Sequence, residues 1–320
     1  MKKLFIAMMA MAAFAACSNE EPVASLQGDA IAFGDAFVDN SVRAIYDEAN
    51  DITGFTVYGN VQGTGAVVAL YGAGAPVTRG GAALNEAWSC EVVRYWTPSC
   101  QYNFAAVANH SGATLEAGVP TKIEYTVDSS DSKDLIYGAT TANTDVNGAP
   151  ESGVNENGIV AFTMNHLLSR VMVSVQNVVE QEDESPYTYA ISNVKIKTWA
   201  QGTYTVNPVA PATPWERLNS GDATLTFTAP ATEVTKSAPV SAGGAQLVIP
   251  GADVEVSFDY VLKFNGTPIY SNTVSGNVTG LEVGHSYNIT ATLDLDNKIE
   301  FTVDDETNLG WGADTTTPIL

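Results

Sequence analysis

The chain is predicted to be all-β, built from two tandem β-sandwiches, and three observations support this. Thr, Val, Gly, Asn and Asp are abundant, whereas Lys, Glu and Leu-rich periodic stretches are sparse, a composition typical of strands and turns. Short runs alternate apolar and polar residues with period two, as half-buried strands do. Asn-Gly pairs at 147–148, 157–158 and 265–266 supply turn signals between runs.

The expected strands follow one another along the whole chain. In the first half they are 52–58, 67–71, 102–108, 122–127 and 171–175. In the second half they are 194–199, 224–228, 246–249, 254–264, 286–295 and 298–303. Asn265 and Gly266 lie between two strand patterns and predict a hairpin turn there. Only residues 163–170 are expected to be helical or irregular.

The length allows two domains. About 300 residues follow the first apolar segment, enough for two domains that each bury a core. The polar, acidic residues 178–186 separate two groups of strands, so we expect the domain boundary there. The predicted organisation is a signal peptide over 1–16, a tether and first strand over 17–43, and sandwiches over 44–185 and 186–320.

The first residues indicate where the protein is sent. Lys2 and Lys3 precede an apolar run over 4–16, which is the pattern of a secretory signal and is too short for a membrane-spanning helix. Small residues lead into Cys17, and this junction resembles a bacterial lipobox, in which the cysteine is lipidated and becomes the first mature residue. The acidic residues that follow resemble a surface-export tag. An ordinary secretory signal cut near a cysteine is the alternative.

The charge restricts the partners. The formal net charge is −22, and it becomes about −24 once the two signal lysines are removed. Such an anionic surface repels phosphate backbones and anionic lipid, which argues against nucleic-acid binding. A lipid chain on Cys17 is therefore expected to hold the protein on the outer membrane.

Cys90 and Cys100 are the other two cysteines. In an oxidising compartment such an even pair permits one disulfide that closes a short loop. Two free thiols are the alternative.

The sequence offers no pattern of a catalytic or metal site. His110, His166 and His285 lie at no metal-ligand spacing and are expected to be hydrogen-bonded structural or surface groups. The acidic stretches 128–134 and 294–296 lack the Gly and terminal Glu of an EF-hand loop, so we expect solvated loops, with a calcium site as the alternative. No enzymatic activity and no cofactor are expected.

Four aromatic residues lie within or beside the segment between the two cysteines: Trp88, Tyr95, Trp96 and Tyr102. Aromatic rings present flat apolar faces, so one interpretation is a platform on which sugars stack. Their alternation with polar residues favours core anchors instead.

Short motifs follow one another in a fixed order along the chain. They are AIAF at 30–33, VRA at 42–44, ITGFTVY at 52–58, DLIYG at 134–138, VAFTMNHLLSRV at 160–171 and IEF at 299–301. In this order they resemble the fimbrillin-like family, the pilins and pilus-associated proteins of type V pili in gut and oral anaerobes. The block at 160–171 is the most recognisable, and the resemblance extends over nearly the whole chain.

The resemblance implies transthyretin-like sandwiches that assemble by strand exchange. In the family, a first strand fills an open groove until an arginine-specific protease removes it. Here that removable strand would span 30–38, with Ile31 and Phe33 pointing the same way, and the cut would fall between Arg43 and Ala44. Arg43 is the only Lys or Arg between Lys3 and Arg79. A lone surface arginine is the alternative.

The resemblance also implies a C-terminal donor strand. The candidate is residues 299–320, in which Ile299, Phe301 and Val303 alternate with polar residues. Three acidic residues at 304–306 break this alternation and weaken the assignment. A tip or accessory subunit, or a surface lipoprotein that does not polymerise, is the alternative.

The expected function is that of a structural subunit or adhesin of a cell-surface pilus, or fimbrium, exported as an outer-membrane lipoprotein. The expected partners are other pilin subunits, an arginine-specific protease, and outer-membrane lipid through Cys17. The alternative is a surface glycan-binding lipoprotein for nutrient capture. That alternative requires Trp88 or Trp96 to face solvent.

Overall fold

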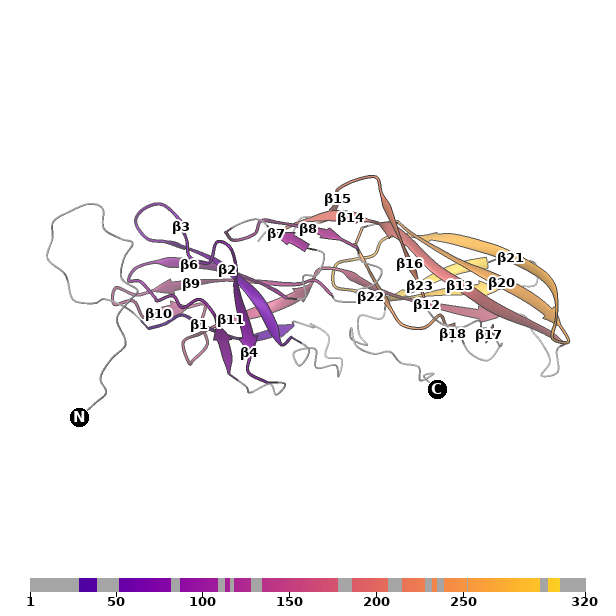
Figure 1. The fold of residues 1–320 in the computed structure, drawn as a ribbon, viewed down its shortest axis with the longest axis horizontal. Coiled ribbons are helices and arrows are strands. Elements are labelled where there is room, and N and C mark those ends of the chain that lie inside the picture. Colours follow the sequence, from indigo (N-terminus) through magenta and orange to yellow (C-terminus); the bar gives the residue numbers. More distant parts are fainter. Residues whose placement is uncertain are drawn as a thin grey trace, which may run out of the picture.

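A computed structural model describes residues 29–38, 52–81, 87–108, 113–115, 118–127, 134–177, 186–206, 215–227, 232–234, 239–251, 253–293 and 299–305. These residues form strands, turns and bends and contain no helix, which confirms the predicted all-β class. Figure 1 shows the strands gathered in two halves placed end to end.

One curled, nine-stranded sheet forms the N-terminal half. Its main path runs β1-β11-β9-β6-β2-β4-β5, with β10 beside β9 and β3 beside β2. The strands are β1 (Ala32–Val38), β2 (Gly54–Gln62), β3 (Val68–Ala69), β4 (Ala75–Arg79), β5 (Trp88–Cys90), β6 (Gln101–Ala108), β9 (Ile136–Thr144), β10 (Pro150–Ser152) and β11 (Ile159–His166). The inner face of this sheet encloses a core rich in aromatic rings, with Phe104, Tyr102 and Phe162 fully buried.

Two facing sheets form the C-terminal half. One runs β18-β12-β22-β23, with β19 beside β12, and the other runs β16-β13-β20-β21, with β17 beside β13. The strands are β12 (Ser169–Asn177), β13 (Tyr187–Trp199), β16 (Asp222–Thr226), β17 (Thr232–Val234), β18 (Val240–Ser241), β19 (Gln246–Val248), β20 (Val254–Phe264), β21 (Thr267–Val278), β22 (Ser286–Leu293) and β23 (Ile299–Asp305). A second, mostly aliphatic core lies between them.

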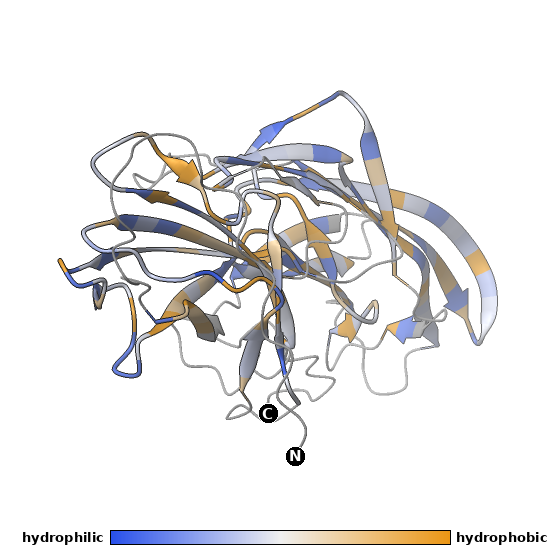
Figure 2. Cartoon of the chain, turned by 60° about the vertical axis from the view of Figure 1, so that its left-hand side comes forward, coloured by the Kyte–Doolittle hydropathy of each residue, from blue (hydrophilic) through white to orange (hydrophobic). Residues whose placement is uncertain are grey.

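Alternation decides which residues enter this core. In β20, Val254, Val256 and Phe258 are buried, and the residues between them are partly exposed. Figure 2 shows hydrophobic and hydrophilic residues alternating along the strands in both halves. The period-two pattern therefore fixes which side of each strand is buried.

A four-stranded sheet joins the halves. Its order is β15-β14-β8-β7, formed by β7 (Ala113–Leu115), β8 (Lys122–Thr126), β14 (Gln201–Thr205) and β15 (Trp215–Arg217). A third buried cluster lies between this sheet and the outer face of the N-terminal sheet. Within it, the indole N–H of Trp215 donates to the Leu167 carbonyl at 2.7 Å. The halves therefore share a core and are not linked by a tether alone.

The predicted boundary at 185/186 is wrong by one strand. β12 precedes that boundary, yet it pairs with β22, β18 and β19 of the C-terminal half. The interpretation of 163–170 as helical or irregular is also wrong, because β11 ends at His166 and β12 begins at Ser169. Leu167 and Leu168 lie between the two strands and are buried, so the apolar pair marks the crossing between the halves.

The predicted hairpin at 265–266 is confirmed. Asn265 and Gly266 have φ values of 47° and 75° and connect β20 to β21, as a turn with two left-handed residues does. Farther along β20, hydrogen bonds from the Asn193 amide and then the Thr273 hydroxyl lower the pKa of Asp259.

Candidate functional site

β1 lies where the two ends of the curled N-terminal sheet meet. It forms a parallel ladder with β11, whereas every other ladder between the described strands of this sheet is antiparallel. On its other side, the Ile31 N–H donates to the Arg94 carbonyl at 2.8 Å, and the Trp96 N–H donates to the Asp29 carbonyl at 3.1 Å. One short segment thus connects both ends of the sheet, and its loss would leave backbone groups unpaired on both sides.

The side chains of this segment fill the N-terminal core. Ile31 and Phe33 are 4% and 3% exposed. The Phe33 ring centroid lies 5.4 Å from that of Tyr71, 5.4 Å from that of Phe104 and 6.2 Å from that of Phe162. Burying a large apolar side chain contributes roughly 1.5–3 kcal/mol, so these two together contribute roughly 3–6 kcal/mol.

Gly34 sets a size limit at the next position. A Cβ placed there would lie 3.1 Å from Ile159 Cγ2 and 3.4 Å from Trp88 Cδ1. The groove under β1 therefore accepts a large apolar residue at position 31, an aromatic residue at position 33 and a small residue at position 34, and position 32 is exposed. The sequence analysis identified Ile31 and Phe33 but missed Gly34, although a glycine inside a strand pattern is a signal of close approach.

One wall of the groove is held by contacts that do not involve β1. The Arg94 Nε donates to the Leu70 carbonyl at 3.2 Å, and its guanidinium lies 6.0 Å from the centroid of the Tyr71 ring. The Tyr71 hydroxyl is buried and has no hydrogen-bond partner among the described residues, and burial raises its pKa. The segment that receives Ile31 is thus anchored to the body of the sheet.

The predicted processing and lipidation residues lie outside the described residues. These are Arg43, Ala44 and Cys17. In sequence, Arg43 falls between the end of β1 and the start of β2. The described chain resumes at Ile52, which is 1% exposed and belongs to the same core as Ile31.

The predicted donor strand forms β23 at an edge of its own C-terminal sheet. It pairs antiparallel with β22 from Leu293 opposite Ile299 to Tyr287 opposite Asp305. The Phe301 ring packs 6.5 Å from that of Phe258 and lies directly over Gly276, where a Cβ would collide with it. Val303, by contrast, is 40% exposed.

The predicted disulfide is absent, because Cys90 and Cys100 are both free thiols. Cys90 lies opposite Val77, which lies opposite Phe55 near the start of β2. Cys100 immediately precedes Gln101, which pairs with the last residue of β2. Phe55 and Gln62 are seven residues apart on β2, so the two cysteines are separated by roughly 23 Å along the strand direction, at about 3.3 Å per residue. A disulfide needs Cα atoms within about 7 Å of each other.

The aromatic residues near the cysteines are mainly core anchors. Trp96 and Tyr102 are 2% and 0% exposed, with ring centroids 4.8 Å apart. Trp88 is half-buried between Phe55, at 5.3 Å, and the Arg79 guanidinium, at 5.6 Å. The preference for core anchors is confirmed for Trp96 and Tyr102. Because both rings are buried, neither can belong to a surface on which sugars stack.

The two described histidines are hydrogen-bonded, as expected. His166 is buried and pairs with Asp134. His285 Nδ1 lies 2.9 Å from Asp305 Oδ2, so it joins the start of β22 to the end of β23. His110 lies outside the described residues. Within the described part of the chain, no three His, Cys, Asp or Glu side chains gather as metal ligands.

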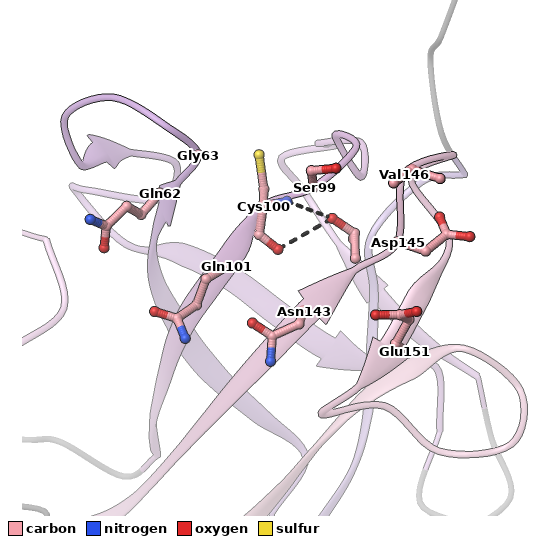
Figure 3. Close-up of a pocket in the computed structure, with 10 residues that line it drawn as sticks. Gln62, Gly63, Ser99, Cys100, Gln101, Asn143, Asp145, Val146 and Glu151 are labelled. Atoms are coloured by element: carbon pink, nitrogen blue, oxygen red, sulfur yellow. Dashed lines mark hydrogen bonds between the residues drawn. The ribbon is translucent and has the colours of Figure 1, made fainter.

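A polar pocket of about 810 Å³ opens at one end of the N-terminal sheet (Figure 3). Three carboxamides, on Gln62, Gln101 and Asn143, lie side by side on adjacent strands there. The Asp145 carboxylate accepts hydrogen bonds from the Asn147 and Ala149 N–H groups and so serves its own turn. The described residues that line this pocket include no histidine and no activated nucleophile, so they form no catalytic arrangement.

The fold and the site together define an all-β protein with a shared core between its halves and a leader strand that completes its first sheet. The fimbrillin-like family model matches residues 43–305. The chain belongs to the fimbrillin-like family. The matched region begins just after β1, at Arg43.

Solved structures show the same fold. A fimbrial protein from Bacteroides vulgatus is 14% identical, with a TM-score of 0.60 over 87% of this chain and 98% of that one. A candidate cell adhesion protein from Bacteroides uniformis is 15% identical, with a TM-score of 0.50 over 86% and 97%. The fimbrial anchor protein Mfa2 from Porphyromonas gingivalis is 10% identical over 87% and 96%, and its TM-score of 0.37 supports no argument. The sequence matches no curated protein.

Membership of this family makes the chain a fimbrial protein, and fimbriae lie on the cell surface. The family is structural and not enzymatic. No helix among the described residues is long and apolar enough to cross a membrane.

Proposed function

We propose that this protein is a fimbrial subunit that is exported as a lipoprotein, cut between Arg43 and Ala44, and assembled by strand exchange in the groove under β1. The observation that supports this most is the position of β1. It is a buried edge strand that precedes Arg43, so a cut there turns it into a non-covalently held segment.

The energetics favour replacement of β1 over an empty groove. Losing Ile31 and Phe33 removes roughly 3–6 kcal/mol of burial. That is a large share of the 5–15 kcal/mol that stabilises a typical domain. It also leaves the β11 edge without its partner strand, and such an edge recruits another strand.

The C-terminal strand of a second copy is the proposed occupant. Its Ile299-Glu300-Phe301 has the same apolar spacing as Ile31-Ala32-Phe33. The match ends at the next position, because Thr302 would take the place of Gly34. There a Cβ lies 3.1 Å from Ile159 Cγ2, so that side chain must shift by a few tenths of an ångström.

Export and release are linked in this proposal. Cys17 carries the lipid, with palmitate among its acyl chains, and lies on the leader side of Arg43. Cleavage therefore separates the folded body from its own anchor. Attachment of a mature filament then depends on other fimbrial subunits.

Treatment of the purified full chain with an arginine-specific protease tests the proposal. The chain should lose the residues up to Arg43 and form ladders that survive mild denaturant. Arg43→Ala should stay a monomer with its leader intact, whereas Arg217→Ala, a charge-matched control at an exposed residue of β15, should assemble like the unmodified chain. Monomers that persist after clean cleavage at Arg43 would refute the strand-exchange step.

A further inference from the structure

β21 is the longest strand at an end of any described sheet. It spans twelve residues, pairs with β20 on one side, and has no ladder partner on the other side among the described strands. Figure 1 shows it beside β20 along the margin of the C-terminal half. All seven residues from 267 to 273 are exposed. Part of its hydrogen-bonding edge is thus open in the intact chain, before any cleavage.

From Tyr270 onward this edge lacks the protection that edge strands ordinarily have. Natural edges are short, carry charged residues or proline, or contain bulges, and each of these discourages pairing with another sheet. The other open sheet ends follow this rule: β5, β7, β15 and β18 have three residues or fewer, β16 carries Asp222, and β23 carries three acidic residues. The sequence of β21, TPIYSNTVSGNV, contains no charged residue, and its proline, Pro268, and the register shift beside it are confined to the hairpin end. An open, uncharged edge of this length favours pairing with another strand.

Apolar side chains lie where the edge is most open. Ile269 and Tyr270 are 54% and 45% exposed. At the same end of the hairpin, Phe264 and Tyr187 are 40% and 38% exposed, with ring centroids 5.0 Å apart. A strand that pairs with β21 would therefore cover apolar surface as well as complete a backbone ladder.

The occupant that suits this edge best is β21 of a second copy. Each copy carries a formal charge of −22, so two copies can approach closely only through surface with few acidic groups. β21 meets that condition from both sides. It is also already held as a strand by β20, so pairing costs little ordering of the chain.

We infer that β21 pairs antiparallel with β21 of another copy across a two-fold axis. The contact is the same on both partners and closes at two copies. β16, at the opposite end of the same sheet, does not suit pairing with a further copy, because it is short and its Asp222 is ion-paired with Lys197 and Arg217. This pairing does not depend on removal of β1, so it would join copies side by side whether or not strand exchange occurs.

Sedimentation of the full, uncut chain over a range of concentrations tests the inference. The unmodified chain should form dimers. Ser271→Lys, which places a charge on an exposed residue of the open edge, should raise the dissociation constant at least tenfold. Thr224→Lys is the matched control, since it adds the same charge to an exposed residue of β16 and should leave the dimer intact.

Hydrogen exchange of β21 amides supplies a second readout that needs no variant. Exchange at residues 267–273 should slow as the concentration of the unmodified chain rises. A chain that stays monomeric at every concentration, equal loss of the dimer in the Thr224→Lys control, or growth into open-ended oligomers would each overturn the inference.

Discussion

Replacing Phe33 by alanine tests whether β1 is removed on assembly or remains a permanent part of the fold. Phe33 is 3% exposed and contacts three aromatic rings, so Phe33→Ala in the uncut chain should cost about 3–5 kcal/mol, as buried Phe→Ala changes do. If β1 is replaced on assembly, the same change should have no effect on the stability of cleaved, assembled subunits, because residue 33 is no longer in them.

The matched control is Phe162→Ala, which removes a ring on the β11 side of the same contact. Phe162 stays in the subunit after cleavage, so this variant should be destabilised both before and after assembly. Urea midpoints of the uncut chain and of the isolated ladders measure both effects. The reasoning fails if Phe33→Ala weakens the ladders as much as Phe162→Ala does, or if it leaves the uncut chain unchanged.

Three further predictions concern other parts of the molecule. Gly276→Ala should destabilise the C-terminal half by about 1–3 kcal/mol in urea unfolding, because its Cβ meets the Phe301 ring, and adding Phe301→Ala should remove most of the clash; additive losses would contradict this. Cys90 and Cys100 should both be alkylated in unfolded, unreduced protein, and a mass spectrum without adducts at these positions would reveal a disulfide. The pKa of Asp259 is lowered in the folded chain, so its carboxylate stabilises the fold fully above the unfolded pKa of about 3.9, and this stabilisation is lost as the pH falls through the folded pKa. Asp259→Asn should therefore reduce the dependence of the free energy of unfolding on acidic pH. An unchanged pH profile in this variant would contradict the prediction.

Alternation predicted most strands that bury one face. β8 and β20 alternate buried and more exposed residues, and the predicted ranges of these strands and of β2 and β6 lie within a few residues of the observed ones. The hairpin turn at 265–266 implied a strand after it, but the range of β21 was not predicted, for a physical reason. Its residues are small, polar and mostly exposed, so no buried face produces a pattern in the sequence.

The candidate site was predictable only in part. Ile31 and Phe33 can be recognised in the sequence because they alternate with small residues. The residues that line their groove share no such sequence pattern. Tyr71, Phe104 and Phe162 lie on three strands that only the sheet topology brings together around Phe33. The disulfide prediction was wrong for the same reason. Cys90 and Cys100 are only ten residues apart in sequence, but the sheet topology places them level with opposite ends of β2.

Hydrogen exchange along β11 tests the central claim most directly, because these amides lie at the edge that β1 covers. The measurement compares the uncut chain with ladders formed after cleavage at Arg43, each analysed for the presence of the leader peptide. The account predicts that β11 is equally protected in both and that the leader is missing from the ladders. Ladders that still hold the leader, or that leave the β11 edge unprotected, would contradict it.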